Sequence, residues 1–310
     1  MSVLYFLESI RNPVLDFFFS VITLFGEETI FMAVGMIVFW CFDKYQGYYL
    51  LYTGFTGTIV NQFLKITCRI PRPWVKDPSF TIVESAREAA TGYSFPSGHT
   101  QSSVGLYGGL ARWNRQRWLR IGGIILCVLV PLSRLYLGVH TPLDVGVSLI
   151  IAIALIFFVY PVVQKAKTSP KLMYLILAVL TAVTIAYLIY VCNYPFPESV
   201  YLNDMHNLQS ARENGFTMLG CMLGLIVIYT VDIKFLHFET KAVWWAQIIK
   251  AVVGIALVLA AKELLKAPLN ALFDGHLAAR SVRYGIMVLI GGGLWPMTFR
   301  WFGKLGQKKN

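Results

Sequence analysis

Long apolar segments recur along almost the whole chain and are separated by short polar turns. A membrane-spanning helix needs about 20 mostly apolar residues, and nine segments approach that length. The predicted spans are 29–42, 46–65, 99–113, 119–138, 142–163, 172–192, 214–232, 243–262 and 283–303. A shorter apolar stretch, 14–25, lies in the interface, re-enters the membrane or forms a tilted first span with residues 3–11. The pattern predicts an all-α, polytopic transmembrane helix bundle.

Composition points to the same class. Of the 310 residues, 56% are hydrophobic and 14% are charged, and the mean hydropathy is +0.61, which is outside the range of soluble domains. The net charge of +11 is concentrated in the turns, as topology signals are, so we expect no nucleic-acid partner. Five widely spaced cysteines predict neither a disulfide framework nor a metal site: Cys41, Cys68, Cys127, Cys192 and Cys221.

Basic residues near span ends indicate the cytoplasmic side. When the segments alternate, the clusters that fall on one side are Arg112, Arg115, Arg117, Arg120, Lys165, Lys167, Lys171, Lys234, Lys241, Arg300, Lys304, Lys308 and Lys309. The loops then predicted outside the cytoplasm are 66–98, 139–141, 193–213 and 263–282. The longest polar loop of the first half, 66–98, is where we expect the chemistry.

Three short motifs lie at these outer span ends. In the first, Lys65 ends a span and Arg72 follows between two prolines, which stiffen the loop. In the second, Ser97-Gly98-His99 precedes an apolar helix whose N-terminal amides suit an oxyanion. Each motif alone is more typical of headgroup anchors or of an ordinary capped helix.

The third motif contains Ser133-Arg134, then His140, then Asp144. A spacing of four residues brings a carboxylate beneath the imidazole if the turn is helical, where it can fix the tautomer. Alone, this segment is typical of a polar turn between two spans. Taken together, the motifs place three cations, two histidines and a carboxylate on one membrane face, which suits a phosphate group.

In order and spacing, these three motifs resemble the signature of the type 2 phosphatidic acid phosphatase superfamily. The resemblance implies a six-helix phosphatase core, followed here by about three additional C-terminal spans. It also implies a metal-independent reaction with no cofactor. The domains we expect are an N-terminal interfacial or first membrane segment (1–28), a catalytic core (29–163) and additional helices of unknown role (164–310).

The same resemblance implies residue roles. His140 matches the nucleophile, Asp144 the residue that orients it, and His99 the acid that protonates the leaving oxygen. The positions that match the phosphate-binding residues are Lys65, Arg72, Arg134, Ser97 and Gly98. Ser133 matches a signature position whose role is unclear. Because one histidine must start neutral and the other protonated, we expect a bell-shaped pH profile for phosphoryl transfer.

A site at headgroup depth favours a lipid substrate that keeps its tails in the bilayer. The expected function is therefore hydrolysis of a lipid phosphate through a phosphohistidine intermediate. The candidates are phosphatidic acid, phosphatidylglycerophosphate, a polyprenyl diphosphate and a sphingoid-base phosphate. We expect an integral membrane protein, in a bacterial plasma membrane, with an extracytoplasmic active site; a homodimer stays open.

The second half carries no signature motif. Its outer loops hold five polar residues that we interpret as solvated rather than as a metal site: Asp204, His206, Glu213, Asp274 and His276. Lys250 lies within an apolar segment and is a functional candidate by default. The extra spans are hypothesised to shape a lipid-entry groove or a dimer contact.

Other functions also fit the sequence. The phosphoryl group can pass to a second lipid or sugar acceptor instead of water. A transporter that recognises lipid phosphates would use the same basic cluster, although the chain shows no internal repeat. A family member that binds without catalysis is a third alternative, which the complete signature disfavours.

Overall fold

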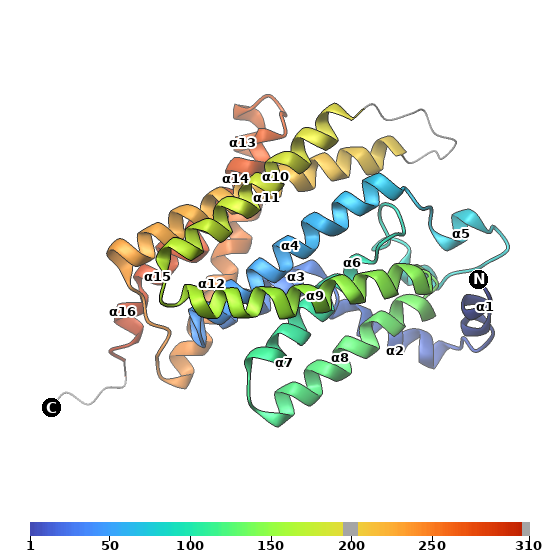
Figure 1. Ribbon diagram of the computed structural model, residues 1–310, viewed down its shortest axis with the longest axis horizontal. Coiled ribbons are helices and arrows are strands. Elements are labelled where there is room, and N and C mark those ends of the chain that lie inside the picture. The colour runs from blue at the N-terminus through green and yellow to red at the C-terminus, as the bar shows by residue number, and fades with distance from the viewer. Residues whose placement is uncertain (195–203, 306–310) are drawn as a thin grey trace. The chain divides into compact units, whose positions relative to one another are not determined.

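The computed structural model describes residues 1–194 and 204–305. In this part of the chain every regular element is a helix and no strand is present, which confirms the predicted all-α class (Figure 1). Each of the nine predicted spans coincides with helix. Lys308 and Lys309, two of the predicted cytoplasmic cations, lie outside the described residues, as does part of the loop 193–213.

Two compact units divide the chain. Unit 1 consists of Met1–Met32, Tyr49–Val162 and Pro195–Ala211, and unit 2 of Ala33–Tyr48, Val163–Tyr194 and Arg212–Asn310. The elements of unit 1 are α1 (Ser2–Ser9), α2 (Pro13–Leu24), the start of α3 (Glu28–Cys41), most of α4 (Lys44–Cys68), α5 (Pro73–Lys76), η1 (Glu84–Ala86), α6 (Gly98–Ser103), η2 (Val104–Gly108), α7 (Gly109–Trp113), α8 (Arg117–Tyr136), most of α9 (Pro142–Ala166) and the first residues of α11 (Asp204–Val231).

Four helical segments of the described residues are long and apolar enough to cross a membrane, namely Arg117–Tyr136, Pro142–Ala166, Pro170–Asn193 and Met205–Leu236. Helices α2 and α3 pass the same test together as a pair bent by 47°, and count as a fifth if they form one span. The polytopic membrane fold is therefore confirmed, whereas nine crossings stay a prediction. Helix α4, for example, coincides with the predicted span 46–65 but carries buried Gln46 and Asn61.

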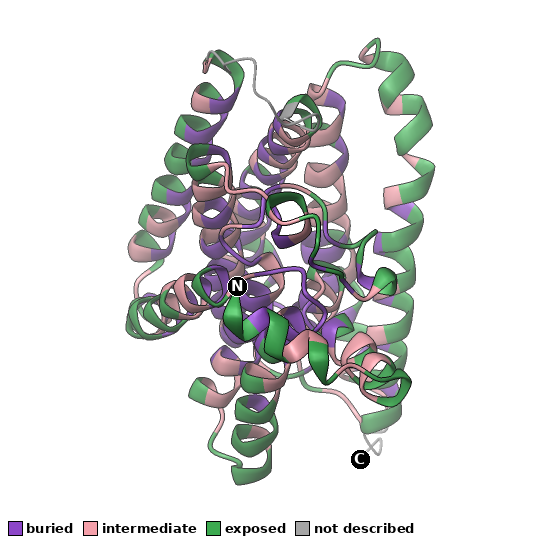
Figure 2. Cartoon of the chain, turned by 90° about the vertical axis from the view of Figure 1, so that its right-hand side faces the viewer, coloured by how far each residue is buried: buried purple, intermediate pink, exposed green. Residues whose placement is uncertain are grey.

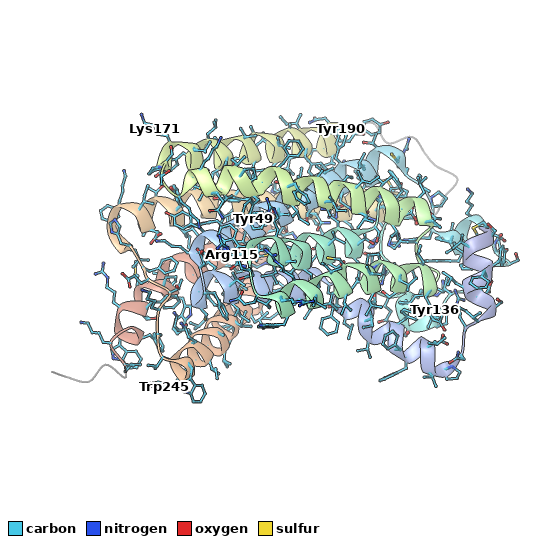
Figure 3. All side chains as sticks on the ribbon, turned by 60° about the horizontal axis from the view of Figure 1, so that its bottom comes forward. Tyr49, Arg115, Tyr136, Lys171, Tyr190 and Trp245 are labelled. Atoms are coloured by element: carbon cyan, nitrogen blue, oxygen red, sulfur yellow. The ribbon has the colours of Figure 1, made fainter. Side chains whose placement is uncertain are left out.

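Helix α8 organises the packing of unit 1. It lies against α2, η2 and the two short helices α6 and α7. Tyr136 lies at its C-terminal end (Figure 3). The Tyr136 hydroxyl donates to Asp16 of α2 at 2.7 Å, and Arg11 donates to the Tyr136 carbonyl at 3.2 Å. The N-terminal helices are thereby attached to the end of α8 from which the third motif begins.

The outward faces of these helices are apolar. Phe17 of α2, Trp118 of α8 and Phe158 of α9 are each more than 70% exposed, at 73%, 72% and 75%. Figure 2 shows exposed residues along the outer sides of the helices and buried residues on their inner sides. Large apolar side chains on the outside suit contact with lipid rather than water.

Unit 2 is built from longer helices. Its elements, besides the remaining parts of α3, α4, α9 and α11, are α10 (Pro170–Asn193), η3 (Asp232–Leu236), α12 (Trp244–Leu264), α13 (Lys266–Leu272), α14 (Ala278–Leu289), η4 (Ile290–Leu294), α15 (Trp295–Met297) and α16 (Phe299–Phe302). A Cβ placed on Gly220 would clash with the Ser281 carbonyl oxygen, so α11 and α14 touch backbone to backbone. Close approach through small residues is typical of helices packed in membranes.

Lys250 faces the interior of unit 2. Its side chain is fully buried, its ammonium donates to the Thr240 carbonyl at 2.8 Å, and it lies 4.1 Å from the centre of the Phe299 ring. The carbonyl and the aromatic ring both stabilise the buried ammonium, so a structural role accounts for a lysine at this position.

A second buried charge in unit 2 belongs to Asp232. The Lys44 ammonium donates to Oδ2 at 2.7 Å, and the Phe238 amide donates to Oδ1 at 3.0 Å. Asp232 is 2% exposed, so its carboxylate depends on these two donors. The pair joins the start of α4 to the end of α11 through residues distant in sequence.

Replacing Asp232→Ala should leave the Lys44 ammonium and the Phe238 amide without their acceptor. Removing one partner of a buried pair costs about 3–5 kcal/mol, so the unfolding temperature in detergent should fall by several degrees. Glu239→Ala, at an exposed carboxylate nearby, is the matched control and should leave it unchanged. Equal unfolding temperatures for the two variants would contradict the assigned role.

Candidate active site

The three sequence motifs meet in unit 1. Lys65 lies in the last turn of α4, Arg72 precedes α5, and His99 lies in the first turn of α6. Arg134 lies in the last turn of α8, and the connection to α9 carries His140. The charged members of this set act electrostatically on His140, so segments far apart in the sequence form one cluster.

Arg72 is held in place by backbone carbonyls. Its Nε donates to Gly92 at 3.1 Å, Nη2 to Thr91 at 2.6 Å and Nη1 to Val139 at 2.8 Å. Pro73 begins α5 directly after it, which fixes the backbone at this point. The side chain is 6% exposed. The stiff loop expected from the prolines thus presents a guanidinium whose position is set by three carbonyls from two backbone segments, 91–92 and 139.

The contact between Arg72 and His140 defines the tautomer of the imidazole. Arg72 Nη1 lies 3.0 Å from His140 Nε2, and because a guanidinium only donates, Nε2 accepts. The proton of the neutral ring is then on Nδ1, which lies 3.5 Å from Asp144 Oδ2. His140 therefore turns a lone pair toward the cations and its N–H toward the carboxylate.

Charge and burial keep this ring neutral. His140 is 1% exposed, and burial together with the cations of Arg72, Arg134 and Lys65 holds its pKa well below the ordinary value of 6.5. Burial also lowers the pKa of Arg72 to about 10, which still leaves the guanidinium charged at neutral pH. A neutral imidazole beside a cation is the state that a nitrogen nucleophile requires.

Asp144 is itself oriented by hydrogen bonds. Its Oδ2 accepts from the Ser94 hydroxyl at 2.5 Å and from the Thr141 amide at 2.7 Å. Its backbone carbonyl accepts from the Ser97 amide at 3.2 Å, which joins the second motif to the third. The carboxylate that faces His140 therefore has little freedom to turn away.

His99 and Gly98 occupy the start of α6. Ser97 caps the helix by accepting from the Thr100 amide at 3.3 Å. A Cβ on Gly98 would meet no atom within 4 Å, so there is room beside this backbone. His99 Nε2 is buried and has no hydrogen-bond partner among the described residues. A proton on this nitrogen would be free to reach a ligand.

Arg134 is fully buried and only partly satisfied. Its Nη1 donates to the Thr23 hydroxyl at 2.6 Å, whereas Nε and Nη2 have no partner in the described part of the chain. Unpaired donors on a buried guanidinium are costly in free energy unless an anion accepts hydrogen bonds from them. The neighbouring Ser133 hydroxyl donates to the Val130 carbonyl at 2.6 Å, within its own helix.

Lys65 approaches the loop 66–98 from α4. Its ammonium donates to the Tyr93 carbonyl at 2.5 Å, immediately before Ser94 in the chain. Lys65 and Arg72 therefore both hold the stretch 91–93. The backbone that precedes the second motif is fixed by two of the cations of the first.

Two contributing residues are absent from the sequence prediction. Ser94 holds the carboxylate of Asp144, and Thr23 holds Arg134 from α2. Ser94 lies close to the second motif, and its proximity was the only available signal. Thr23 is far from every motif in sequence, and no spacing rule connects a lone threonine on an apolar helix to a phosphate site.

The polar residues of the second half do not gather. Glu213 pairs with Arg280 at 2.9 Å, and His276 Nδ1 accepts from the Ala278 amide at 3.1 Å. Among the described residues there is no group of three or more His, Cys, Asp or Glu placed to hold a metal ion. Asp204 begins α11, and its side chain is outside the described set.

Comparison with known proteins provides independent findings. The model of the PAP2 superfamily matches residues 46–168, and the model described as PAP2 superfamily phosphatase, transmembrane extension, matches residues 216–308. Undecaprenyl-diphosphatase BcrC of Bacillus subtilis (strain 168) is 30% identical over 155 residues, which cover 48% of this chain and 76% of that protein. No solved structure matches the chain.

Two further relatives are named as phosphatases of a different lipid phosphate. The probable sphingosine-1-phosphate phosphatase of Dictyostelium discoideum is 32% identical over 160 residues, which cover 47% of this chain and 38% of the relative. Human sphingosine-1-phosphate phosphatase 2 is 26% identical over 158 residues, which cover 49% and 39%. Because the first family model spans all three motifs and the BcrC alignment covers most of that relative, the chain belongs to the PAP2 superfamily.

Proposed function

We propose that this integral membrane protein hydrolyses a lipid phosphate through a phosphohistidine formed on His140 Nε2. The observation that carries the proposal is the orientation of this ring, whose unprotonated nitrogen faces the cations while Nδ1 faces Asp144. The relatives named above are phosphatases of a polyprenyl diphosphate and of a sphingoid-base phosphate, and this supports a lipid substrate.

The phosphate would be bound by the cations that now contact carbonyls or have no partner. A phosphate oxygen accepts a stronger hydrogen bond from Arg72 than a neutral imidazole does, so substrate binding would draw Nη1 away from His140 Nε2. Arg134 Nε and Nη2 would donate to the same group. Lys65 and the Ser97-Gly98 backbone would complete the set.

The transfer then needs few movements. The Nε2 lone pair attacks phosphorus, the bond from phosphorus to the lipid oxygen breaks, and that oxygen takes a proton from His99. The imidazole becomes positively charged while it carries the phosphoryl group, and Asp144 stabilises it through Nδ1–H. Water, with its proton accepted by His99, next cleaves the nitrogen–phosphorus bond and restores the neutral ring.

The proposed setting follows from the same placement. Cations gathered at the ends of α4 and α8 would lie at headgroup depth, so the lipid tails stay in the bilayer while the phosphate enters. The predicted orientation places this end outside the cytoplasm, and we propose a bacterial plasma membrane. The substrate class comprises the four lipid phosphates named from the sequence.

The direct test is phosphate release by the purified protein in detergent with EDTA present. Wild type should release phosphate from at least one of phosphatidic acid, phosphatidylglycerophosphate, undecaprenyl diphosphate and sphingosine 1-phosphate. His140→Ala should lose at least about 10³-fold in kcat, since it lacks the nucleophile. Release from none of the four by wild type, or undiminished release by the variant, would overturn the proposal.

The protonation state of His140 can be measured directly. Because its pKa is held well below 6.5, the ring should remain neutral, with the proton on Nδ1, when the pH falls from 8 to 6. Protonation, and loss of the nucleophilic lone pair, should occur only at lower pH. ¹⁵N NMR of histidine-labelled protein, assigned with His140→Ala, measures this. A His140 midpoint at or above 6.5 would be inconsistent with the account.

Ser94→Ala removes one of the two hydrogen bonds that orient the Asp144 carboxylate, and the Thr141 amide still donates the other. A hydrogen bond to a charged group contributes about 1.5–3 kcal/mol, so kcat should fall about 10- to 100-fold while KM stays within about threefold. Ser85→Ala, at an exposed serine of the same loop, is the control. A rise in KM with kcat unchanged, or no change in either constant, would show that Ser94 does not position the carboxylate.

A further inference from the structure

The turn that joins α2 to α3 lies directly against the candidate active site. Thr23, at the end of α2, accepts the hydrogen bond from Arg134. A Cβ on Gly26 would lie 3.0 Å from His99 Cβ and 3.1 Å from the His99 carbonyl oxygen. The Tyr107 hydroxyl donates to the Phe25 carbonyl at 3.1 Å, which fixes the middle of the turn. Residues 23–28 are called the α2–α3 turn below.

The α2–α3 turn carries two adjacent carboxylates. Glu27 directly follows Gly26, the residue that lies against His99. Glu27 acts electrostatically on Arg134, and Glu28 on Lys65. Glu28 is exposed, so a bound ligand can reach its carboxylate.

Neither carboxylate neutralises its cation. Among the described residues no ion pair joins Glu27 to Arg134 or Glu28 to Lys65. Arg134 is fully buried and keeps two donor atoms unpaired, and His99 Nε2 is also unpaired. The cations are thus left for an anion, and the carboxylates remain beside it as a separate negative group.

A ligand that matches both features carries a phosphate and, close to it, a positive charge. A carboxylate attracts an ammonium and repels a second phosphate at the same position. Among the substrate candidates, a sphingoid-base phosphate has an ammonium near its phosphate monoester. A polyprenyl diphosphate places another anionic group there instead, and phosphatidic acid has no charged group at that point.

We propose that the α2–α3 turn is a specificity element, in which Glu27 and Glu28 select lipid phosphate monoesters that bear an ammonium group next to the phosphate. This inference rests on the proposed function and deepens it. Glu28 also begins α3, where an acidic residue favours the helix dipole, so a purely structural role must be separated by experiment.

The test compares two probes that differ at the nitrogen, sphingosine 1-phosphate with a cationic ammonium and its N-acetyl derivative with a neutral amide. Wild type should show a kcat/KM at least about tenfold higher for the free amine, mainly through KM. In Glu27→Gln, in Glu28→Gln and most strongly in the double variant, this ratio should fall toward one. The double variant should also gain activity on undecaprenyl diphosphate relative to the free amine.

Glu88→Gln, at an exposed carboxylate of the loop 66–98, is the matched control and should keep the wild-type ratio. If wild type hydrolyses both probes equally, or the variants lose activity on both without a change in ratio, the specificity role is overturned and the phosphatase remains. If wild type hydrolyses neither probe nor the other three lipid phosphates, the proposed function itself fails.

Discussion

The hydrogen bond between Arg72 and His140 is the contact on which the arrangement of the site depends. A guanidinium that donates to Nε2 leaves Nδ1 as the protonated nitrogen, and only an acceptor on the far side of the ring can then satisfy it. Asp144 occupies that side. Nδ1 makes no hydrogen bond within the described residues, and Asp144 Oδ2 lies 3.5 Å from it, held there by Ser94 and the Thr141 amide.

The same contact explains why the cations are anchored so differently. Arg72 donates to three carbonyls besides His140, so it is a fixed reference for the ring. Arg134 instead has a single partner, Thr23, and two unpaired donor atoms in the described residues. Arg72 therefore holds the His140 ring in one orientation, whereas Arg134 keeps donor atoms available within the described part of the chain. The single partner of Arg134, Thr23, comes from α2, which lies before the region that the family model matches.

Much of the fold follows from hydrophobic pattern, because membrane helices must satisfy their backbones internally. The helix limits were predicted within a few residues for segments such as Pro142–Ala166, since Pro142 begins the helix and the apolar run accounts for most of its length. The number of crossings was not fixed by pattern alone. Helix α4 shows why: it coincides with the predicted span 46–65 and is as long as a span, yet it is not among the segments apolar enough to cross a membrane, and it carries buried Gln46 and Asn61. The division at 1–28, 29–163 and 164–310 stays a prediction.

For the site, motif spacing was sufficient to name the charged residues that act on His140, because each lies at or next to a helix end. Spacing could not reveal Thr23 or the α2–α3 turn, whose relation to Arg134 exists only in three dimensions. The roles of the gathered residues remain the proposal to be tested.

The most direct measurement is a rapid-quench, single-turnover reaction with a lipid substrate labelled in its phosphate, followed by peptide mapping of the protein. The account predicts an acid-labile, base-stable phosphoryl group on His140 that forms and decays at least as fast as phosphate is released, and that is absent in His140→Ala. Phosphate release with no labelled protein, or with the label on another residue, would contradict it.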